Sequence, residues 1–337
     1  MTEPSSLATS STAFRERMRN SSKWMWMGLM LLLAPRLLRV ESAHGELRPI
    51  RLLARAGHVK KGTEKQTCFP ITFPRNHQID VGRMVMRVHG GSHHVHLYRP
   101  VSGPVVYPTP DCPFAVDFSK WELVTATQSA SLNWKLHPGV AIAFGPHQPL
   151  LIQTHFVNTG LLETRRKAHA EIVLHPMDPA EVTAHAGALF GQDRAVLVPP
   201  GLSTQSSTCQ LTGSAAEHRE MTVMALSGHY HFRGVRFEVW RTGADGTRGE
   251  LVYQHDGYAD PKFQQYRPGE LVLRPGEGLE WACTWQNDTP ETYEFGPNTQ
   301  KNEHCNLFGY YYPTDDPFEA IDCVHAEDGQ NVRIQAH

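Results

Sequence analysis

Apolar side chains recur at every second position in several short stretches of this chain. The alternation is clear in residues 84–88 and 279–285, and in a third stretch Val235, Phe237 and Val239 alternate with Arg and Glu. A period of two residues places alternate side chains on the same face of a β-strand. The pattern therefore predicts many short strands with one buried face, and it predicts that Val235 points inward with Phe237 and Val239.

Turn-forming residues separate these stretches. Pro, Gly, Asn and Asp cluster at 74–76, 90–91, 243–246 and 275–278, where the chain is expected to reverse. Only residues 179–190 fit a helical period, and they fit it weakly. Because strands do not alternate with helices, the pattern predicts an all-β fold built from sandwiches.

The length of 337 residues is sufficient for two domains of ordinary size. Pro176 and Pro179 interrupt the alternation near the middle of the chain. We therefore predict two tandem β-sandwich domains, at residues 44–177 and 178–337.

The first 43 residues have the features of an export signal. Basic residues precede an apolar run at 24–34, and a small-residue site at 41–43 precedes His44. The run is about 11 residues long, whereas a membrane span needs about 20. We predict a signal peptide at residues 1–43, a secreted or periplasmic protein, and no stable membrane span after signal removal. An uncleaved anchor is the alternative.

Charge and cysteine content narrow the possibilities further. The net charge of -2 gives no electrostatic reason to expect nucleic acid as a partner. The six cysteines contain no CxxC pair, which argues against a thiolate metal site. In an oxidising compartment they predict three disulfides, although the sequence alone leaves 15 pairings open.

Histidine is abundant, with 20 residues, and the most distinctive motif is His229-Tyr230-His231. Two histidines two residues apart on one strand present both imidazoles to the same face, where they can share a metal. His304 is the candidate for a third ligand. Ordinary surface or core histidines are the alternative interpretation of such a pair.

The first half contains the sequence Ser92-His93-His94-Val95-His96. Spacing alone pairs His94 with His96 and sends His93 to the opposite face, unless the strand ends or bulges there. His155 lies in an apolar strand and is either a ligand or a neutral core histidine. Imidazole clusters without carboxylates suit copper or zinc, and no HExxH, GxSxG, P-loop or GxGxxG motif is present.

Taken in order, these motifs resemble those of the copper type II ascorbate-dependent monooxygenases, the family of peptidylglycine alpha-hydroxylating and dopamine beta-monooxygenases. The resemblance covers about residues 65–325 and is strongest from 228 to 313. Its histidine motifs are Gly91-Ser92-His93-His94, Gln153-Thr154-His155, Gly228-His229-Tyr230-His231 and Glu303-His304-Cys305-Asn306, and Arg241-Thr242-Gly243, residues 253–258, Pro275-Gly276-Glu277, Cys283 and residues 310–313 also match.

The resemblance implies two jelly-roll-like β-sandwich domains that present two coppers across a solvent-filled cleft. It implies that one metal is held by His93, His94 and His155, and that a second, catalytic metal is held by His229, His231 and His304. The implied reaction uses O2 and ascorbate, or another one-electron reductant, to hydroxylate a C–H bond of a small substrate. The implied disulfides are Cys68–Cys112, Cys209–Cys323 and Cys283–Cys305.

Three positions depart from the family pattern. His304 stands where the family has methionine, Ser227 stands where peptidylglycine enzymes have the arginine that binds a carboxylate, and Phe308 replaces a tyrosine. Asn306 matches a substrate-side position. The change at His304 leaves a non-catalytic secreted copper-binding protein of the same fold as the main alternative. A β-sandwich binding module and a copper site at a free His44 amine are further alternatives.

Overall fold

A computed structural model describes residues 47–89, 92–101, 104–110, 112, 120–158, 165–211, 217–325 and 331–336. The predicted signal peptide lies outside these residues. Within them the fold is all-β, as predicted, and a single 3-10 turn, η2 (Pro179–Glu181), is the only helical element. No described helix has the length and apolar character that crossing a membrane requires.

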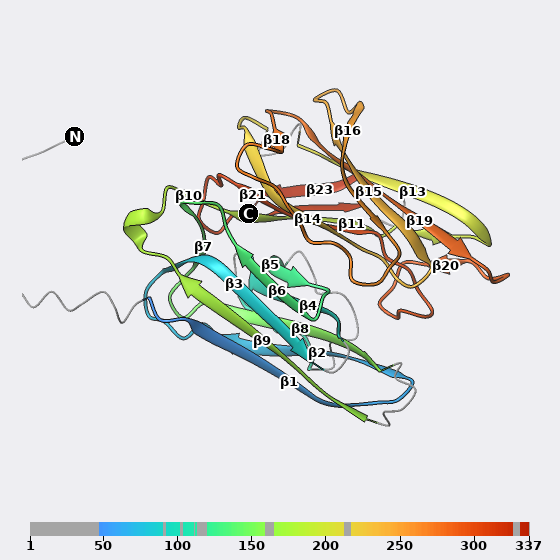
Figure 1. Cartoon of the computed structure of the whole chain (residues 1–337), viewed down its shortest axis with the longest axis horizontal. Coiled ribbons are helices and arrows are strands. Elements are labelled where there is room, and N and C mark those ends of the chain that lie inside the picture. The colour runs from blue at the N-terminus through green and yellow to red at the C-terminus, as the bar shows by residue number, and fades with distance from the viewer. Residues whose placement is uncertain are drawn as a thin grey trace, which may run out of the picture. The chain divides into compact units, whose positions relative to one another are not determined.

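The first half of the chain forms two sheets that face each other (Figure 1). One sheet has the order β1-β9-β3-β7-β10, with β6 also paired to β3; the other has the order β2-β8-β4-β5. The bounds are β1 (Ile50–Lys60), β2 (Thr63–Thr72), β3 (Ile79–His89), β4 (Ser92–Pro100), β5 (Trp121–Thr127), β6 (Ser131–Lys135), β7 (Val140–Phe144), β8 (Pro149–Asn158), β9 (Arg165–Pro176) and β10 (Ala184–His185).

The second half forms a second pair of sheets. One has the order β17-β14-β21-β11-β22-β23, with β18 also paired to β14; the other has the order β13-β19-β15-β16, and β12 pairs with β20 in a separate ladder. The bounds are β11 (Gly187–Asp193), β12 (Leu197–Val198), β13 (Gly201–Gln210), β14 (Met221–His229), β15 (Gly234–Thr242), β16 (Arg248–Asp256), β17 (Gln264–Gln265), β18 (Val272–Leu273), β19 (Gly278–Asn287), β20 (Tyr293–Glu294), β21 (Asn306–Tyr312), β22 (Ile321–His325) and β23 (Asn331–Ala336).

We call the two pairs of sheets the first and the second sandwich. The chain passes from one to the other between β10 and β11, and the exact domain boundaries remain a prediction.

The observed burial follows the predicted alternation in most strands. In β19, Leu279, Trp281 and Trp285 are buried. Val235 is an exception, because it is 39% exposed whereas Phe237 is fully buried. The register of β15 against β19 shifts between Gly234 and Arg236, so Val235 is an extra residue that breaks the pleat.

The weak helical pattern at residues 179–190 corresponds to η2 and two strands. Asp178 caps η2 through its side chain, which accepts from Ala180 N at 2.9 Å, and the chain is extended from β10 onward. Strand β11 is buried along its whole length because it pairs with both β21 and β22. Complete burial removes the polar face that would mark a strand, which explains the ambiguous pattern.

Three disulfides stabilise the two sandwiches. Cys68–Cys112 lies in the first sandwich, whereas Cys209–Cys323 and Cys283–Cys305 lie in the second. The pairing is the one that the resemblance implies. Three disulfides indicate an oxidising, extracellular environment.

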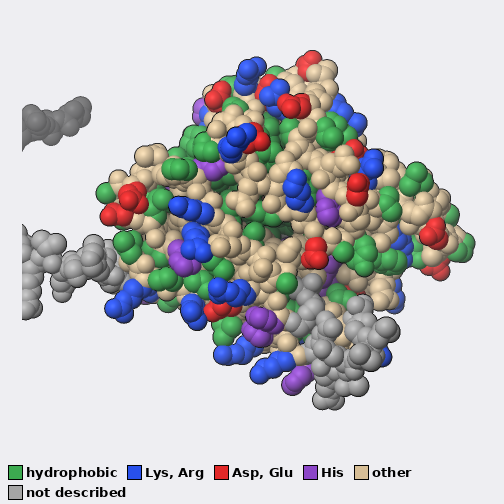
Figure 2. All heavy atoms as spheres, in the orientation of Figure 1, with side chains coloured by type: hydrophobic (Ala, Val, Ile, Leu, Met, Phe, Trp, Pro, Cys, Tyr) green, Lys and Arg blue, Asp and Glu red, His purple; other side chains and the backbone are tan. Residues whose placement is uncertain are grey.

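The sandwiches pack through an apolar contact. Trp134 of β6 packs against Tyr310 of β21 in a tilted arrangement with ring centroids 4.6 Å apart, and the ring centroid of Phe263 lies 5.5 Å from that of Trp134. Tyr310 Oη accepts a hydrogen bond from Ala126 N at 2.9 Å. Charged side chains of both signs are spread between hydrophobic ones on the face shown in Figure 2, as the small net charge leads one to expect.

Candidate metal centre

Strand β4 carries two neighbouring histidines that meet a third histidine on β8. The β4–β8 ladder pairs His94 with His155, and its register shifts between Ser92 and His94. His93 is the extra residue at this bulge. A bulge redirects a side chain that strict alternation would send to the opposite face. The structure therefore groups His93 with His94, the arrangement that spacing alone disfavoured relative to His94 with His96.

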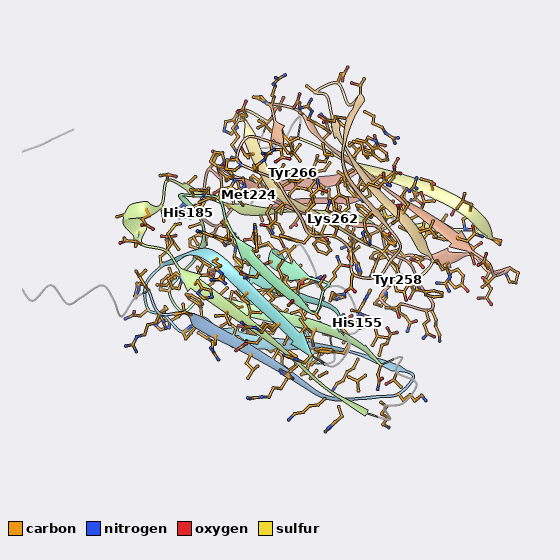
Figure 3. All side chains as sticks on the ribbon, viewed as in Figure 1. His155, His185, Met224, Tyr258, Lys262 and Tyr266 are labelled. Carbon is orange, nitrogen blue, oxygen red and sulfur yellow. A yellow bond between two sulfur atoms is a disulfide. The ribbon has the colours of Figure 1, made fainter. Side chains whose placement is uncertain are left out.

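The rings of His93, His94 and His155 form a compact triangle. Their centroids are 5.2 Å apart for His93 and His94, 5.2 Å for His93 and His155, and 5.1 Å for His94 and His155. One imidazole nitrogen from each lies within 4.8 Å of the other two. His155 lies on the side of the first sandwich that faces the second (Figure 3).

Glu64 of β2 orients His155 and connects it to the second sandwich. His155 Nε2 donates to Glu64 Oε2 at 2.9 Å, and Thr299 Oγ1 donates to the same oxygen at 3.0 Å. Asn298 Nδ2 donates to the other carboxylate oxygen. Burial raises the pKa of Glu64, but the hydrogen bonds from His155 and Thr299 outweigh it and hold the pKa below its usual value. The ionised carboxylate thus leaves Nδ1 of His155, which is buried without a partner among the described residues, as the possible ligand atom.

The second group of histidines lies at a strand end and in loops. Alternation predicted His229 and His231 on one strand, but β14 ends at His229 and His231 follows it. Their ring centroids are nevertheless 5.6 Å apart. A tight turn brings His231 back, with Gly234 N donating to His231 O at 2.9 Å. Only glycine fits at position 234, because a Cβ there would lie 1.6 Å from the ring of Tyr230.

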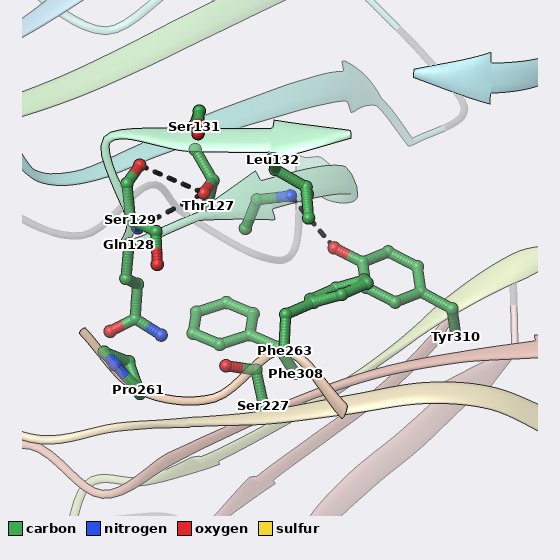
Figure 4. A pocket seen from close by; sticks show the side chains of 11 residues that line it. Thr127, Gln128, Ser129, Ser131, Leu132, Ser227, Pro261, Phe263, Phe308 and Tyr310 are labelled. Atoms are coloured by element: carbon green, nitrogen blue, oxygen red, sulfur yellow. Dashed lines mark hydrogen bonds between the residues drawn. The ribbon is translucent and has the colours of Figure 1, made fainter. Parts of the chain in front are cut away.

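In each of these two histidines one ring nitrogen donates a hydrogen bond, and the other ring nitrogen has no partner among the described residues. His229 Nδ1 donates to Gln128 Oε1, and the same amide donates through Nε2 to Gly228 O at 2.7 Å. His231 Nδ1 donates to Asn302 O at 2.9 Å. Both Nε2 atoms are buried and have no partner among the described residues. Gln128 belongs to the first sandwich (Figure 4), so the orientation of His229 depends on the packing of the two sandwiches.

His304 approaches the same pair from the loop before β21. Its ring centroid is 4.4 Å from that of His231 and 5.5 Å from that of His229. Its Nδ1 is buried and likewise lacks a partner within the described part of the chain. The neighbouring disulfide Cys283–Cys305 ties this loop to β19.

Glu303 holds the backbone around His231. Its carboxylate is fully buried and accepts from His231 N at 3.0 Å, Arg233 N at 3.3 Å, Arg233 Nη1 at 3.3 Å and Trp285 Nε1 at 3.1 Å. Burial raises the pKa of Glu303 to about 7, while the hydrogen bonds from Arg233 and the backbone act in the opposite direction. This single side chain, which directly precedes His304, therefore fixes the turn that follows His229.

The two groups of histidines meet at His93. Its ring centroid lies 4.8 Å from that of His229 and 5.4 Å from that of His231. His93, His229 and His231 form a second set with ligand atoms within 4.8 Å of one another, whereas His304 belongs to neither set. The resemblance implies a solvent-filled cleft between the groups, but the structure brings their rings together.

Five imidazoles of this centre have pKa values that favour the neutral form. Burial lowers the pKa values of His93, His94, His229 and His304 well below the usual value, and neighbouring histidines lower them further. Burial also lowers the pKa of His231, to about 4. A neutral imidazole presents a lone pair, and lone pairs from buried histidines suit copper or zinc.

Two further residues lie beside the centre: His96, which spacing alone pairs with His94, and Asn306, which the resemblance places on the substrate side. His96 stacks on His94 with centroids 4.2 Å apart, and its Nδ1 lies 2.8 Å from Tyr98 Oη, but it is in neither ligand set. Asn306 pairs with His229 across β14 and β21, and its Oδ1 is buried without a partner among the described residues. Both residues line a small cavity that also contacts His304.

Sequence reasoning missed Gln128, Glu64 and Asn302, the acceptors that orient the histidines. No local motif marks them, because each contacts a histidine that lies far away in the sequence. A carboxylate such as Glu64 in an otherwise alternating strand is the only available signal, and it is weak.

Comparison with known proteins identifies one family. Residues 188–333 match the copper type II ascorbate-dependent monooxygenase, C-terminal domain. No curated protein sequence matches the chain. The solved structures with some likeness include PNGase F, a glycosylasparaginase from Flavobacterium meningosepticum, with 8% identity, a TM-score of 0.38, and coverage of 79% of this chain and 96% of that one. VP54 of PBCV-1 gives 9% identity, a TM-score of 0.27, and coverage of 78% and 94%. Likenesses at these scores carry no argument about function.

Proposed function

Since this chain belongs to the copper type II ascorbate-dependent monooxygenase family through its second sandwich, we propose that it binds two coppers and hydroxylates a C–H bond of a small substrate with O2. The family match supports a copper-dependent oxidoreductase activity in general. The two-copper stoichiometry, the reductant and the hydroxylation are our proposal.

In this proposal His93, His94 and His155 hold one copper, and His229, His231 and His304 hold the other. Copper, when bound, supplies one-electron chemistry with ascorbate or a similar reductant and the reduction of O2, with one oxygen atom entering the substrate and the other leaving as water.

The observation that carries the proposal is the state of the imidazole nitrogens. His155, His229 and His231 each donate one nitrogen to an oxygen acceptor and leave the other buried and unpaired among the described residues. Histidine ligands of metals show this arrangement, because the second hydrogen bond fixes the ring and its tautomer. Three buried orphan nitrogens without a bound partner would otherwise cost about 1–3 kcal/mol each.

The chain's own residues have defined tasks in this scheme. Gln128 and Asn302 keep the Nε2 atoms of His229 and His231 directed into the centre. Glu64 does the same for Nδ1 of His155.

Copper content tests the proposal. Plasma mass spectrometry of the exported chain, reconstituted and freed of loose metal, should give close to two coppers per chain. His94→Ala and His229→Ala should each remove about one copper. His218→Ala is the matched control, because its side chain is 65% exposed, and it should change nothing. Absence of bound copper in the wild type would refute the proposal.

The role of His304 needs a separate measurement. X-ray absorption at the copper edge should show one fewer imidazole in His304→Ala than in the wild type. An unchanged spectrum would remove His304 from the ligand set. In the absence of oxygen, ascorbate should abolish the electron paramagnetic resonance signal of Cu(II) in the wild type. Addition of O2 should restore that signal if the centre turns over.

A further inference from the structure

The outer face of the sheet that contains β1, β9, β3 and β6 carries mostly cations. Alternate side chains of these strands point away from the core of the first sandwich. Figure 2 shows Lys, Arg and His side chains gathered over β1, β9 and β3, the strands in the lower part of Figure 1. We call this surface the basic face, and its Lys and Arg residues are Arg51, Arg55, Arg83, Arg87, Lys135 and Lys167.

A single carboxylate opposes these cations among the described residues of the basic face. Glu171 of β9 lies between two arginines, with its oxygens 3.3 Å from Arg51 Nη1 and 3.1 Å from Arg87 Nη1. The remaining Lys and Arg residues of the face have no acidic side chain beside them on it. The small net charge of the whole chain therefore conceals a strong local excess of positive charge.

Strand pairing places positive groups side by side on this face. Arg83 of β3 is the direct partner of Lys135 on β6 and of His175 on β9. Like charges directly opposite one another on neighbouring strands oppose folding, and a histidine adds to the repulsion whenever it is protonated. Packing of the sheet gives no reason for this arrangement, whereas a bound anion would offset the repulsion.

An open groove of about 190 Å³ lies at the centre of the basic face. Its floor is formed by Val85 and Val173, which are direct partners on β3 and β9 and are almost fully buried. Arg51, Arg83 and Arg87 stand at its rim, and the side chain of Arg51 is 73% exposed. Such a groove suits an extended ligand that lays C–H groups on the valines and presents acidic groups to the arginines. Guanidinium groups bind sulfate and carboxylate oxygens in pairs.

These features favour an acidic polysaccharide over other polyanions. The valine floor is recessed, so a planar lipid surface would contact only the rim. Proteins that bind single-stranded nucleic acid stack the bases on aromatic rings, and the described residues of the basic face include no Phe, Tyr or Trp. The three disulfides indicate an extracellular environment, where sulfated and uronic-acid polysaccharides are common polyanions.

We propose that the basic face binds a linear polysaccharide that carries sulfate or carboxylate groups. The groove holds the sugar rings above Val85 and Val173, and the surrounding cations bind the acidic groups. The sheet of the basic face lies opposite the sheet of β4 and β8 that carries His93, His94 and His155. The proposal therefore stands apart from the proposed copper chemistry, and it provides a means of retaining the protein on an acidic matrix.

The first test compares polymers of different charge. Binding of the full chain, with its disulfides intact, to dextran sulfate and to polygalacturonate is measured by calorimetry, and uncharged dextran is the control. At least one acidic polymer should bind about tenfold or more tightly than dextran, and binding should weaken with added salt because salt screens the charges. The proposal is overturned if neither acidic polymer exceeds dextran, or if duplex DNA or phosphatidylserine vesicles bind more tightly than both.

Paired variants locate the binding on the basic face. The double variant Arg51→Gln/Arg83→Gln should weaken binding of the acidic polymer at least about tenfold, because two charge-assisted contacts are lost. The matched control Arg236→Gln/Arg267→Gln removes the same charge from two exposed arginines of the second sandwich and should have less than about a twofold effect. Equal weakening by the two variants would show that binding follows net charge alone, and the proposal would fail.

His175 provides a further measurement on the unaltered protein. Burial lowers the pKa of His175, and the charges of Arg83 and Arg87 lower it further. A sulfate or carboxylate bound among these groups would offset the repulsion, so a saturating acidic polymer should raise the pKa of His175 and bind more tightly as the pH falls. An NMR titration of the ring signals measures this shift, with those of His218 on the second sandwich as the internal control. An unchanged pKa of His175 in the complex would place the polymer elsewhere and overturn the proposal.

Discussion

The two groups of histidines are built in different ways. His94 and His155 are direct partners on adjacent strands, so the β-ladder itself sets their distance. His231 and His304 lie outside strands and depend on the buried carboxylate of Glu303 and on a glycine turn. The first group is therefore a product of strand pairing, whereas the second is a product of side-chain hydrogen bonds.

The two groups also depend on each other. Gln128 of the first sandwich orients His229 of the second, and Asn298 and Thr299 of the second sandwich hold Glu64, which orients His155 of the first. Correct docking of the sandwiches is therefore a condition for the orientation of both groups. The difference in construction predicts that the second group is more sensitive to loss of a single residue.

The largest difference should appear in stability. Glu303→Ala removes a buried carboxylate that serves Arg233, Trp285 and His231, and it should lower the free energy of unfolding by about 3–5 kcal/mol. Glu64→Ala removes a partly exposed carboxylate and should cost about 1 kcal/mol. Urea unfolding of both chelator-treated variants, with disulfides intact, measures the two values. A cost for Glu303→Ala no larger than that for Glu64→Ala would contradict the contrast.

Copper affinity should show a smaller and site-selective effect. Gln128→Ala should weaken the site of His229, and Glu64→Ala should weaken the site of His155, each by about 10–100-fold, because both remove the acceptor that orients a ligand. Competition with a Cu(I) chelator measures the affinity, and combination with His94→Ala or His229→Ala isolates one site at a time. Equal weakening of both sites by either variant would show that the histidines around His93 act as one unit.

The smallest effect concerns a buried carboxyl outside both groups. Burial raises the pKa of Asp322 on β22 well above its usual value, and both of its oxygens lack a partner among the described residues. A raised pKa in the folded state means that stability is greatest below the unfolded pKa of about 4 and falls as the pH rises toward the folded pKa.

Asp322→Asn removes this titration. Its stability advantage should grow with increasing pH and reach on the order of 1 kcal/mol, measured by urea unfolding in a pH series. A pH-independent difference would show that the carboxyl is not responsible. Any pH dependence that survives in Asp322→Asn can then be assigned to groups other than this carboxyl.

The strands were predictable from local periodicity, whereas the grouping of His93 with His94 and His155 was an implication of the family resemblance and not of the spacing. Buried positions such as Trp281 and Met86 repeat every two residues, and that repeat is visible in the chain itself. The bulge at His93 and the exposure of Val235 escaped prediction, since a register shift depends on the partner strand. The contact between Gln128 and His229 escaped it too, because it exists only after two sandwiches dock, and no local pattern encodes docking.

The Cys283–Cys305 disulfide has a consequence for the order of maturation. Cys305 is fully buried and directly follows His304, so a reduced chain would present a thiol beside the candidate copper ligands. A thiolate is a softer ligand than imidazole and competes strongly for Cu(I). Oxidation of the pair removes this competitor before any metal arrives. We therefore expect that the protein acquires copper after disulfide formation, and that copper supplied to the reduced chain is captured in the wrong place.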